Sequence, residues 1–355
     1  MEKNSKDFLH RYLDNVSPTG FESSGQKIWL DYLKPFIDED FVDVYGTAVG
    51  VINPGKDFKV VIEAHADEIS WFVNYITDDG YLYVIRNGGS DFQIAPSMRC
   101  HVYTENGDVI KGVFGWPAVH VRHDKNPEAK QENIFIDIGC SSREEVEKRG
   151  IHIGSVAVFE ANSEWLTDDY LIARALDNRI GGYMIAEVAR KINENKIDLP
   201  FSLYIVNSVQ EEIGLRGAEM ISRRINPDVA IVTDVTHDTY SPLYNKKKQG
   251  DCKCGRGPVV SYGPAVQNNL LKHIVDTSKD KDISIQRTAA SRSTGTDTDA
   301  FAYSASGVAS ALISLPLKYM HTTVEMVHKD DIQGCIDLIY NSVIGLKSGH
   351  SFNYL

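Results

Sequence analysis

Histidines and carboxylates that stand at the ends of predicted strands are the residues of this 355-residue sequence best suited to chemistry. Short, β-branched, apolar runs predict strands at residues 59–64, 201–209, 229–233 and 310–315. In an open parallel sheet, ligands bind beyond the carboxyl ends of the strands. We therefore expect a shared site at one edge of a sheet, built from His65, Asp67, Asp177, Glu211, Glu212, Asp234 and His321.

The types of these side chains indicate which ions they would bind. Imidazoles and carboxylates without a thiolate favour Zn²⁺, Co²⁺ or Mn²⁺. Taken as ligands, Asp177, Glu212 and Asp234 carry three negative charges, and a bridging hydroxide would add a fourth, a total that two divalent cations balance. Two ions about 3.5–4 Å apart can share that hydroxide and polarise a carbonyl group. The composition of the set thus predicts a hydrolytic site with two divalent metal ions.

The spacing within the set suggests different roles. His65 and Asp67 are two residues apart and face the same side of an extended chain, so Asp67 can accept a hydrogen bond from the imidazole. Glu211 and Glu212 are adjacent, so their side chains diverge. One of the two glutamates can bind metal while the other faces the substrate as a general base.

Composition excludes several classes of partner. The net charge of −12 and the lack of a Lys/Arg-rich stripe argue against nucleic acid and anionic membranes. We find no apolar signal-like run and no stretch long enough to span a membrane, and five scattered cysteines fit reduced thiols, so we expect a cytoplasmic protein. Cys252 and Cys254 form a C-x-C without a second pair, which favours a plain loop over a zinc site.

The order of predicted elements favours one α/β domain interrupted by an insertion. Helices are expected near residues 8–13, 28–33, 179–194, 218–224 and 269–278, alternating with the strands above. Between these halves, residues 70–161 alternate short β-rich runs with turn signals, which is typical of a small all-β module. We expect a mainly parallel mixed sheet flanked by helices, formed by residues 1–69 plus 162–355, with residues 70–161 inserted.

Six motifs resemble those of a known family: AHADEIS (64–70), ALDNRIGG (175–182), EEIGLRGA (211–218), TDVT (233–236), GTDTDAFAYS (295–304) and PLKYMHTTVEMV (316–327). They are similar to the tetrahedral dodecameric metallo-aminopeptidases, the forty-second metallopeptidase family, which includes glutamyl and deblocking aminopeptidases and proteins formerly labelled endoglucanases. The likeness spans nearly the whole chain. It implies a zinc-peptidase-like catalytic domain carrying a β-barrel-like lid and dimerisation domain.

The resemblance also implies a site. One ion, Zn²⁺ or Co²⁺, would be held by His65, Asp177 and Asp234, and the other by Asp177, Glu212 and His321. Asp177 would bridge the ions and Glu211 would be the general base. We hypothesise that a metal-bridging hydroxide cleaves the first peptide bond of peptides with a free N-terminus, and the resemblance implies dimers that assemble into a dodecamer.

Two other functions remain open at this stage. A two-metal deacylase or amidohydrolase could use the same fold and ligands, and a catalytically silent, metal-bound assembly protein could retain the site. A glycosidase would explain paired carboxylates but neither His65 nor His321. Departures from the family at Ser70, Trp71, Asp299 and residues 251–257 bear on substrate preference, for which Arg292 and Asp299 are candidates. The histidines at 101, 120, 123, 237 and 328 are expected to be surface or satisfied residues.

Overall fold

Runs of β-branched and apolar residues form a mixed eight-stranded sheet in the computed structural model, which describes residues 2–122 and 128–355. The four strands at its centre are parallel to one another, and the neighbouring strand on each side pairs with them in the antiparallel direction. In spatial order the strands are β1 (Glu39–Val42), β2 (Ala48–Ile52), β12 (Ser202–Ser208), β3 (Lys59–His65), β13 (Val229–His237), β16 (Ala309–Leu317), β14 (Val259–Tyr262) and β15 (Gln286–Ala289).

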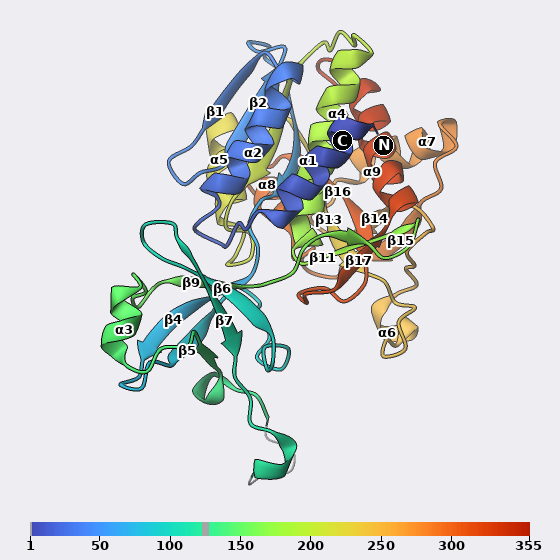
Figure 1. Ribbon diagram of the computed structural model, residues 1–355. Helices are drawn as coiled ribbons and strands as arrows, with labels where there is room; N and C mark the ends of the chain where they lie inside the picture. The colour runs from blue at the N-terminus through green and yellow to red at the C-terminus, as the bar shows by residue number, and fades with distance from the viewer. Residues whose placement is uncertain (1, 123–127) are drawn as a thin grey trace.

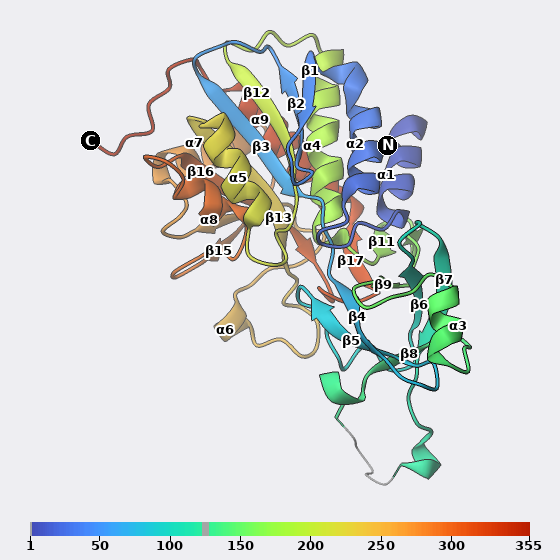
Figure 2. The ribbon, with the colours of Figure 1, turned by 90° about the vertical axis from the view of Figure 1, so that its left-hand side faces the viewer.

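Helices cover both faces of this sheet (Figures 1 and 2). Because successive residues of a strand point to opposite faces, Val60 and Ile62 of β3 join one core cluster and Val61 joins another. The first cluster includes α1 (Lys3–Asp14), α2 (Ser23–Leu33), α4 (Leu176–Glu194), α7 (Asn268–Asp280) and α9 (Lys329–Ile344). The second includes α5 (Arg216–Ile225) and α8 (Asp297–Ala302). The strands are thus buried on both faces, which explains their nearly continuous apolar sequences.

A closed antiparallel barrel is inserted after β3 and projects from the end of the sheet (Figure 2). Its strands, in order around the barrel, are β4 (Ser70–Ile76), β5 (Leu82–Asn87), β8 (Phe135–Asp137), β7 (Val109–Phe114), β6 (Arg99–Tyr103) and β9 (Val156–Phe159). Trp71, Val84 and Phe114 lie in a core of its own. Four residues separate the end of β3 at His65 from the start of β4 at Ser70, so the barrel begins beside a candidate ligand.

The remaining elements are short. A three-stranded sheet of β10 (Glu164–Trp165), β11 (Tyr170–Ala173) and β17 (Glu325–His328) lies beside the main sheet. Short helices are α3 (Arg143–Lys148) and α6 (Lys246–Gln249), with 3₁₀ turns at Lys34–Phe36, Val119–Val121 and Gln131–Asn133. None of the helices in the described part of the chain combines the length and apolarity that a membrane span needs.

The predicted fold class is confirmed, since a mainly parallel mixed sheet flanked by helices carries an inserted barrel. The expected strands and helices all occur, with ends shifted by a few residues. One placement was wrong: Asp234 lies inside β13 opposite Ser314 of β16, because the strand continues to His237 instead of ending at residue 233. The domain division at residues 69/70 and 161/162 stays a prediction.

We expect the substitution Ile62→Ala to destabilise the fold by about 2–5 kcal/mol, because it opens a cavity in a fully buried position of the central strand β3. The measurement is the urea concentration at the unfolding midpoint. Ile153→Ala is the matched control, since Ile153 is exposed and its truncation should cost less than about 0.5 kcal/mol. Equal effects of the two substitutions would contradict the assigned core.

Candidate metal centre

The fold brings all seven predicted site residues together at the carboxyl edge of the central sheet. His65 ends β3, Glu211 and Glu212 follow β12, and Asp234 lies near the end of β13. In the described part of the chain, two groups of side chains are arranged so that they could hold a metal ion. They are His65, Glu211 and Asp234, and Asp177, Glu212 and His321, with the ligand atoms of each group within 4.8 Å of one another.

Asp177 lies between the two histidines. Its Oδ1 is 3.3 Å from Nε2 of His65, and its Oδ2 is 3.3 Å from Nε2 of His321. Each carboxylate oxygen therefore faces a different imidazole. A single carboxylate in this position belongs geometrically to both groups.

The other contacts have the spacing that cations require. Nε2 of His65 is 3.8 Å from both Asp234 Oδ1 and Glu211 Oε2, and Nε2 of His321 is 3.5 Å from Glu212 Oε2. Ligands about 2.0–2.2 Å from a tetrahedral ion lie roughly 3.3–3.6 Å from each other. Most of these distances are long for hydrogen bonds and suit donors arranged around ions. The donor set of imidazoles and carboxylates fits divalent cations.

Asp67 is a buried carboxylate that holds the glutamate loop. Its Oδ1 accepts a hydrogen bond of 2.9 Å from the backbone N–H of Glu211, and its Oδ2 accepts one of 3.2 Å from that of Glu212. Oδ2 also accepts a hydrogen bond from the hydroxyl of Thr19. Oδ1 lies 3.4 Å from Nδ1 of His65, on the opposite side of the imidazole from Asp177. Asp67 thus connects three segments of the site.

Glu325 positions the backbone of the second group, which contains Asp177 and His321, much as Asp67 positions the glutamate loop. The sequence did not predict this role. Oε2 of Glu325 accepts a hydrogen bond of 3.0 Å from the backbone N–H of Asp177, and its Oε1 accepts one of 2.7 Å from that of His321. The side chain is buried. Its position four residues after His321, inside a recognised motif, was the available signal.

The site holds more buried negative charge than its histidines can offset. Burial raises the pKa of Glu211 to about 10, and neighbouring carboxylates reinforce the shift. Burial also raises the pKa values of Glu212 and Asp234. The nearby carboxylates of Asp177 and Glu212 raise the pKa of His321 to about 11. Buried carboxylates whose charged forms are this costly are the environment that bound cations relieve.

A further buried acid pair lies behind the centre. The hydroxyl oxygen of Ser208 lies 2.6 Å from Oε1 of Glu63 in β3 and 2.7 Å from Oδ2 of Asp297 in α8, and its single proton can be donated to only one of them at a time. Burial and the charge of Asp297 raise the pKa of Glu63 well above its ordinary value. One proton shared between two such carboxyls avoids burying a second charge. Neither residue was predicted as part of the site.

The barrel touches the centre through a glycine. A Cβ atom on Gly89, in the loop after β5, would lie 2.7 Å from the ring of His321. Only a residue without a side chain lets the loop approach the imidazole so closely. Next to it, a cavity of about 20 Å³ is lined by Trp71, Ser90 and Phe159 of the barrel together with candidate ligands. Barrel residues thus form one wall of the candidate centre.

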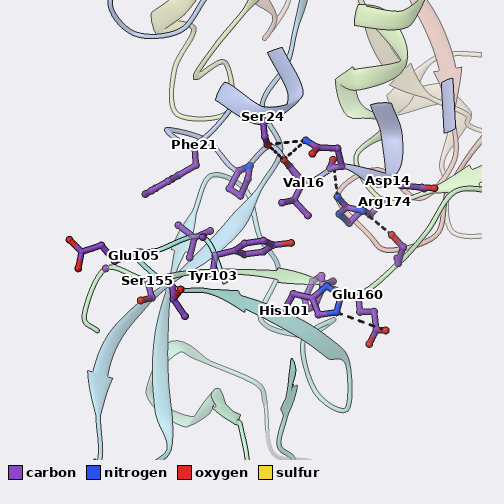
Figure 3. Close-up of a pocket in the computed structure, with 18 of the residues that line it drawn as sticks. Asp14, Val16, Phe21, Ser24, His101, Tyr103, Glu105, Ser155, Glu160 and Arg174 are labelled. Atoms are coloured by element: carbon purple, nitrogen blue, oxygen red, sulfur yellow. Dashed lines mark hydrogen bonds and ion pairs between the residues drawn. The ribbon is translucent and has the colours of Figure 1, made fainter. Parts of the chain in front are cut away.

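A larger cavity of about 750 Å³ lies elsewhere, between the α1–α2 connection and the barrel (Figure 3). Val16 and Phe21 line it from one side and Tyr103 and Ser155 from the other. None of the seven predicted site residues lines this cavity. Its wall includes Arg174, whose Nε lies 2.9 Å from Oε2 of Glu68, the residue after Asp67. We therefore place the chemistry at the metal centre and not in the larger cavity.

Asp299, Cys252 and Cys254, which the sequence also singled out, belong to neither candidate metal group of the described residues. Both Asp299 oxygens accept hydrogen bonds from Thr294 N–H, and Oδ2 also accepts one from Gly295 N–H, so Asp299 holds the loop that carries Arg292. Cys252 and Cys254 are buried free thiols, and neither belongs to a candidate metal group in the described residues. His123 lies outside the described residues.

The chain is similar to aminopeptidases over nearly its whole length. The family model described as M42 glutamyl aminopeptidase matches residues 46–338. A lysyl aminopeptidase from Pyrococcus furiosus is 34% identical over 336 residues, which cover 94% of each chain. The structure of a TET aminopeptidase from a marine sediment Thaumarchaeota archaeon matches with a TM-score of 0.92 at 26% identity, covering 98% of both chains. A TET1 peptidase from Pyrococcus horikoshii, described as assembling into a tetrahedron or a large octahedral shell, gives a TM-score of 0.84 at 26% identity, covering 96% of this chain and 100% of its own.

The ion-free protein should lose stability as the pH rises. Glu211 titrates near 4.5 in an unfolded chain and near 10 in the folded one, so between these values only the folded state retains the proton, and stability falls with increasing pH. His321, raised from 6.5 to about 11, acts in the same direction. We expect the unfolding temperature in a chelator to drop from about pH 5.5 to about pH 8.5.

Thermal unfolding followed by circular dichroism, with chelator or with added Zn²⁺, measures this effect. Added cation should remove most of the decline, because it binds the deprotonated ligands. The same pH dependence in both conditions would be inconsistent with a cation-binding centre.

Glu325→Gln should weaken metal binding about 10–100-fold, because an amide offers one acceptor oxygen to two backbone N–H groups and turns an N–H toward the other. Metal content after dialysis against graded chelator concentrations measures the loss. Glu164→Gln, at an exposed position of β10, is the matched control and should retain wild-type affinity. Unchanged affinity in Glu325→Gln would show that this carboxylate does not position the ligands.

Proposed function

Because this chain belongs to the M42 glutamyl aminopeptidase family, we propose that it is a two-metal aminopeptidase that removes single residues from the free N-terminus of peptides. Because the family consists of aminopeptidases, the protein is a hydrolase of peptide bonds. The observation that carries the two-metal proposal is the position of Asp177, with one carboxylate oxygen toward each histidine. A carboxylate that bridges two ions has this arrangement.

The number of donors in each group supports the ligand assignment implied by the family resemblance. His65, Asp177 and Asp234 would hold one ion, and Asp177, Glu212 and His321 the other, with Zn²⁺ or Co²⁺ as the expected metals. Without Glu212, the second ion would keep only Asp177 and His321 as protein donors. Without Glu211, the first ion would still have three. Glu211 is therefore the spare carboxylate. Bound cations would activate a water molecule and polarise the scissile carbonyl group.

Glu211 is the proposed general base. Its backbone N–H is bound by Asp67, and its Oε2 lies 3.8 Å from Nε2 of His65. The pKa of Glu211, which burial raises, falls when positive charge is added nearby, so the carboxylate is available to accept a proton. It takes this proton from the attacking water and returns it to the leaving amine. Asp67 holds the imidazole and the glutamate loop in place during both transfers.

We further propose a homo-oligomer in which dimers assemble into a dodecamer, with residues 70–161 serving as a lid and dimerisation domain on residues 1–69 plus 162–355. The assembly of the similar Pyrococcus horikoshii TET1 peptidase into a tetrahedron or a large octahedral shell supports this proposal. The contact of Gly89 with the ring of His321 supports a role of the barrel as a lid. A cytoplasmic location, which the five free cysteines favour, belongs to the same proposal.

The proposal is tested by hydrolysis of aminoacyl-para-nitroanilides and their N-acetylated counterparts. Chelated enzyme should be inactive, and added Zn²⁺ or Co²⁺ should restore cleavage of the free-amine substrates only. Cleavage of the acetylated substrates would instead indicate a deacylase. Silence on the whole panel, with metal bound, would indicate a catalytically silent assembly protein.

Two matched variants accompany this experiment. Glu211→Gln should retain both ions while kcat falls about 10²–10⁴-fold, because only proton transfer is lost. Glu212→Gln should lower metal content as well as activity, because the second group loses a donor. If both variants lost metal equally, the division of roles between the two glutamates would be wrong.

A further inference from the structure

Residues 244–257, called here the basic segment, concentrate positive charge in an acidic protein. The segment contains Asp251 as its single acidic residue and five basic ones, Lys246, Lys247, Lys248, Lys253 and Arg256, whereas the whole chain has a net charge of −12. Most of the segment is exposed. This cluster is shorter than the Lys/Arg-rich stripe that nucleic-acid binding would require.

Three of these cations gather around one aromatic ring. Nζ of Lys246 lies 2.9 Å from the centre of the Tyr240 ring, Cζ of Arg256 lies 5.0 Å from it, and Nζ of Lys253 lies 5.1 Å from it. Arg256 also donates a hydrogen bond of 3.1 Å to the Tyr240 hydroxyl. Asp251 is 3.8 Å from Lys246. Like charges brought this close repel one another, and an exposed cation–π contact offsets only about 0.5–1 kcal/mol. The cluster is therefore suited to an anionic ligand.

Buried groups hold the base of the segment in place. Oδ1 of Asp238 accepts a hydrogen bond from Tyr240 N–H, and Oδ2 accepts one from Cys254 N–H, at 2.7 and 2.8 Å. The two oxygens of Asp331 accept hydrogen bonds from the N–H groups of Gly255 and Gly257. A cluster that is already held in position loses less entropy when a ligand binds.

The basic segment lies beside the candidate metal centre. It follows β13, the strand that carries Asp234, and the Tyr244 hydroxyl lies 3.4 Å from Nδ1 of His237 at the end of that strand. Figures 1 and 2 show α6, which forms part of the segment, at the same end of the sheet as the barrel. Tyr240 is six residues beyond Asp234, so at most roughly 20 Å of extended chain separates them. A peptide of about six extended residues spans that distance.

We propose that the basic segment binds acidic side chains of the substrate on the carboxyl side of the cleaved bond, so that the enzyme prefers peptides with Asp or Glu several residues from the N-terminus. This inference rests on the proposed aminopeptidase function. In this proposal the residue being removed is not the one recognised, because none of the cations around Tyr240 belongs to the seven residues of the candidate metal centre. A peptide fits better than nucleic acid, since the rest of the chain carries a large negative charge that repels a phosphate backbone.

The test compares peptides that share their first two residues and continue with glutamates, glutamines or lysines. At low ionic strength, kcat/KM for the glutamate peptide should exceed that for the glutamine peptide about 10-fold, and the lysine peptide should be the poorest. The preference should vanish near 0.5 M salt, where the screening length is only about 4 Å. The triple variant Lys246→Gln/Lys253→Gln/Arg256→Gln should lose the preference, so that its kcat/KM values for the glutamate and glutamine peptides become equal.

The matched control is Lys27→Gln/Lys281→Gln/Lys347→Gln, which removes the same charge from exposed positions on α2, after α7 and after α9. It should retain the preference. If the cluster variant does not fold, the double variant Lys247→Glu/Lys248→Glu, at exposed positions of α6, serves in its place and should reverse the preference.

The possible outcomes distinguish a failure of this inference from a failure of the proposed aminopeptidase function. Equal cleavage of the glutamate and glutamine peptides by the wild type would overturn the inference and leave the aminopeptidase intact. Absence of metal-dependent cleavage of every peptide would overturn the function itself. Loss of the preference in the control variant would show that net charge, not this segment, is responsible. Stronger inhibition by a single-stranded oligonucleotide than by an acetylated glutamate peptide would assign the segment to nucleic acid instead.

Discussion

Buried negative charge at one edge of the central sheet is the constraint on which the rest of the site depends. Asp177, Glu211, Glu212 and Asp234 lie close together around two imidazoles. Burial raises the pKa values of Glu211, Glu212 and Asp234, whereas the two imidazoles hold the pKa of Asp177 below its ordinary value despite its burial. Carboxylates gathered in this way need either protons or cations. The arrangement persists because parallel strands end at one edge and each contributes a short loop there. Divalent ions are the partners that satisfy all of these groups at once.

Two carboxylates outside the candidate ligands give the centre its geometry. Asp67 accepts hydrogen bonds from the backbone of Glu211 and Glu212, and Glu325 accepts them from the backbone of Asp177 and His321. Each one joins loops that are distant in sequence. Because the bonds go to backbone N–H groups, they fix where a loop starts and leave the ligand side chains free to turn toward an ion. The positions of the ligands are thus determined by buried charge as well as by the sheet.

The sequence revealed the fold class and the convergence of the site, but not its fine structure. His65, Glu211 and Glu212 could be found because apolar strands with clear ends precede them. Asp234 was placed just beyond its strand, since β13 continues through polar residues whose pairing with β16 depends on the tertiary fold. Asp67 was predicted as the partner of His65, but its hydrogen bonds to the backbone of Glu211 and Glu212 were not. Glu325 was missed altogether, because residue types alone do not identify partners of backbone groups. The cluster at Tyr240 was missed because its cations come from different turns and meet only after folding.

The order of segments along the chain sets the order in which parts of the molecule can be completed during synthesis. All strands of the barrel lie between Ser70 and Phe159, so the ribosome releases them as one continuous stretch. The metal centre instead needs His65 from before the barrel and His321 and Glu325 from near the end of the chain. Since domains generally fold as units during synthesis, the barrel can close when His65 is the only one of the five proposed ligands that has been made. The candidate metal centre can therefore be completed only after synthesis has passed His321, near the end of the chain.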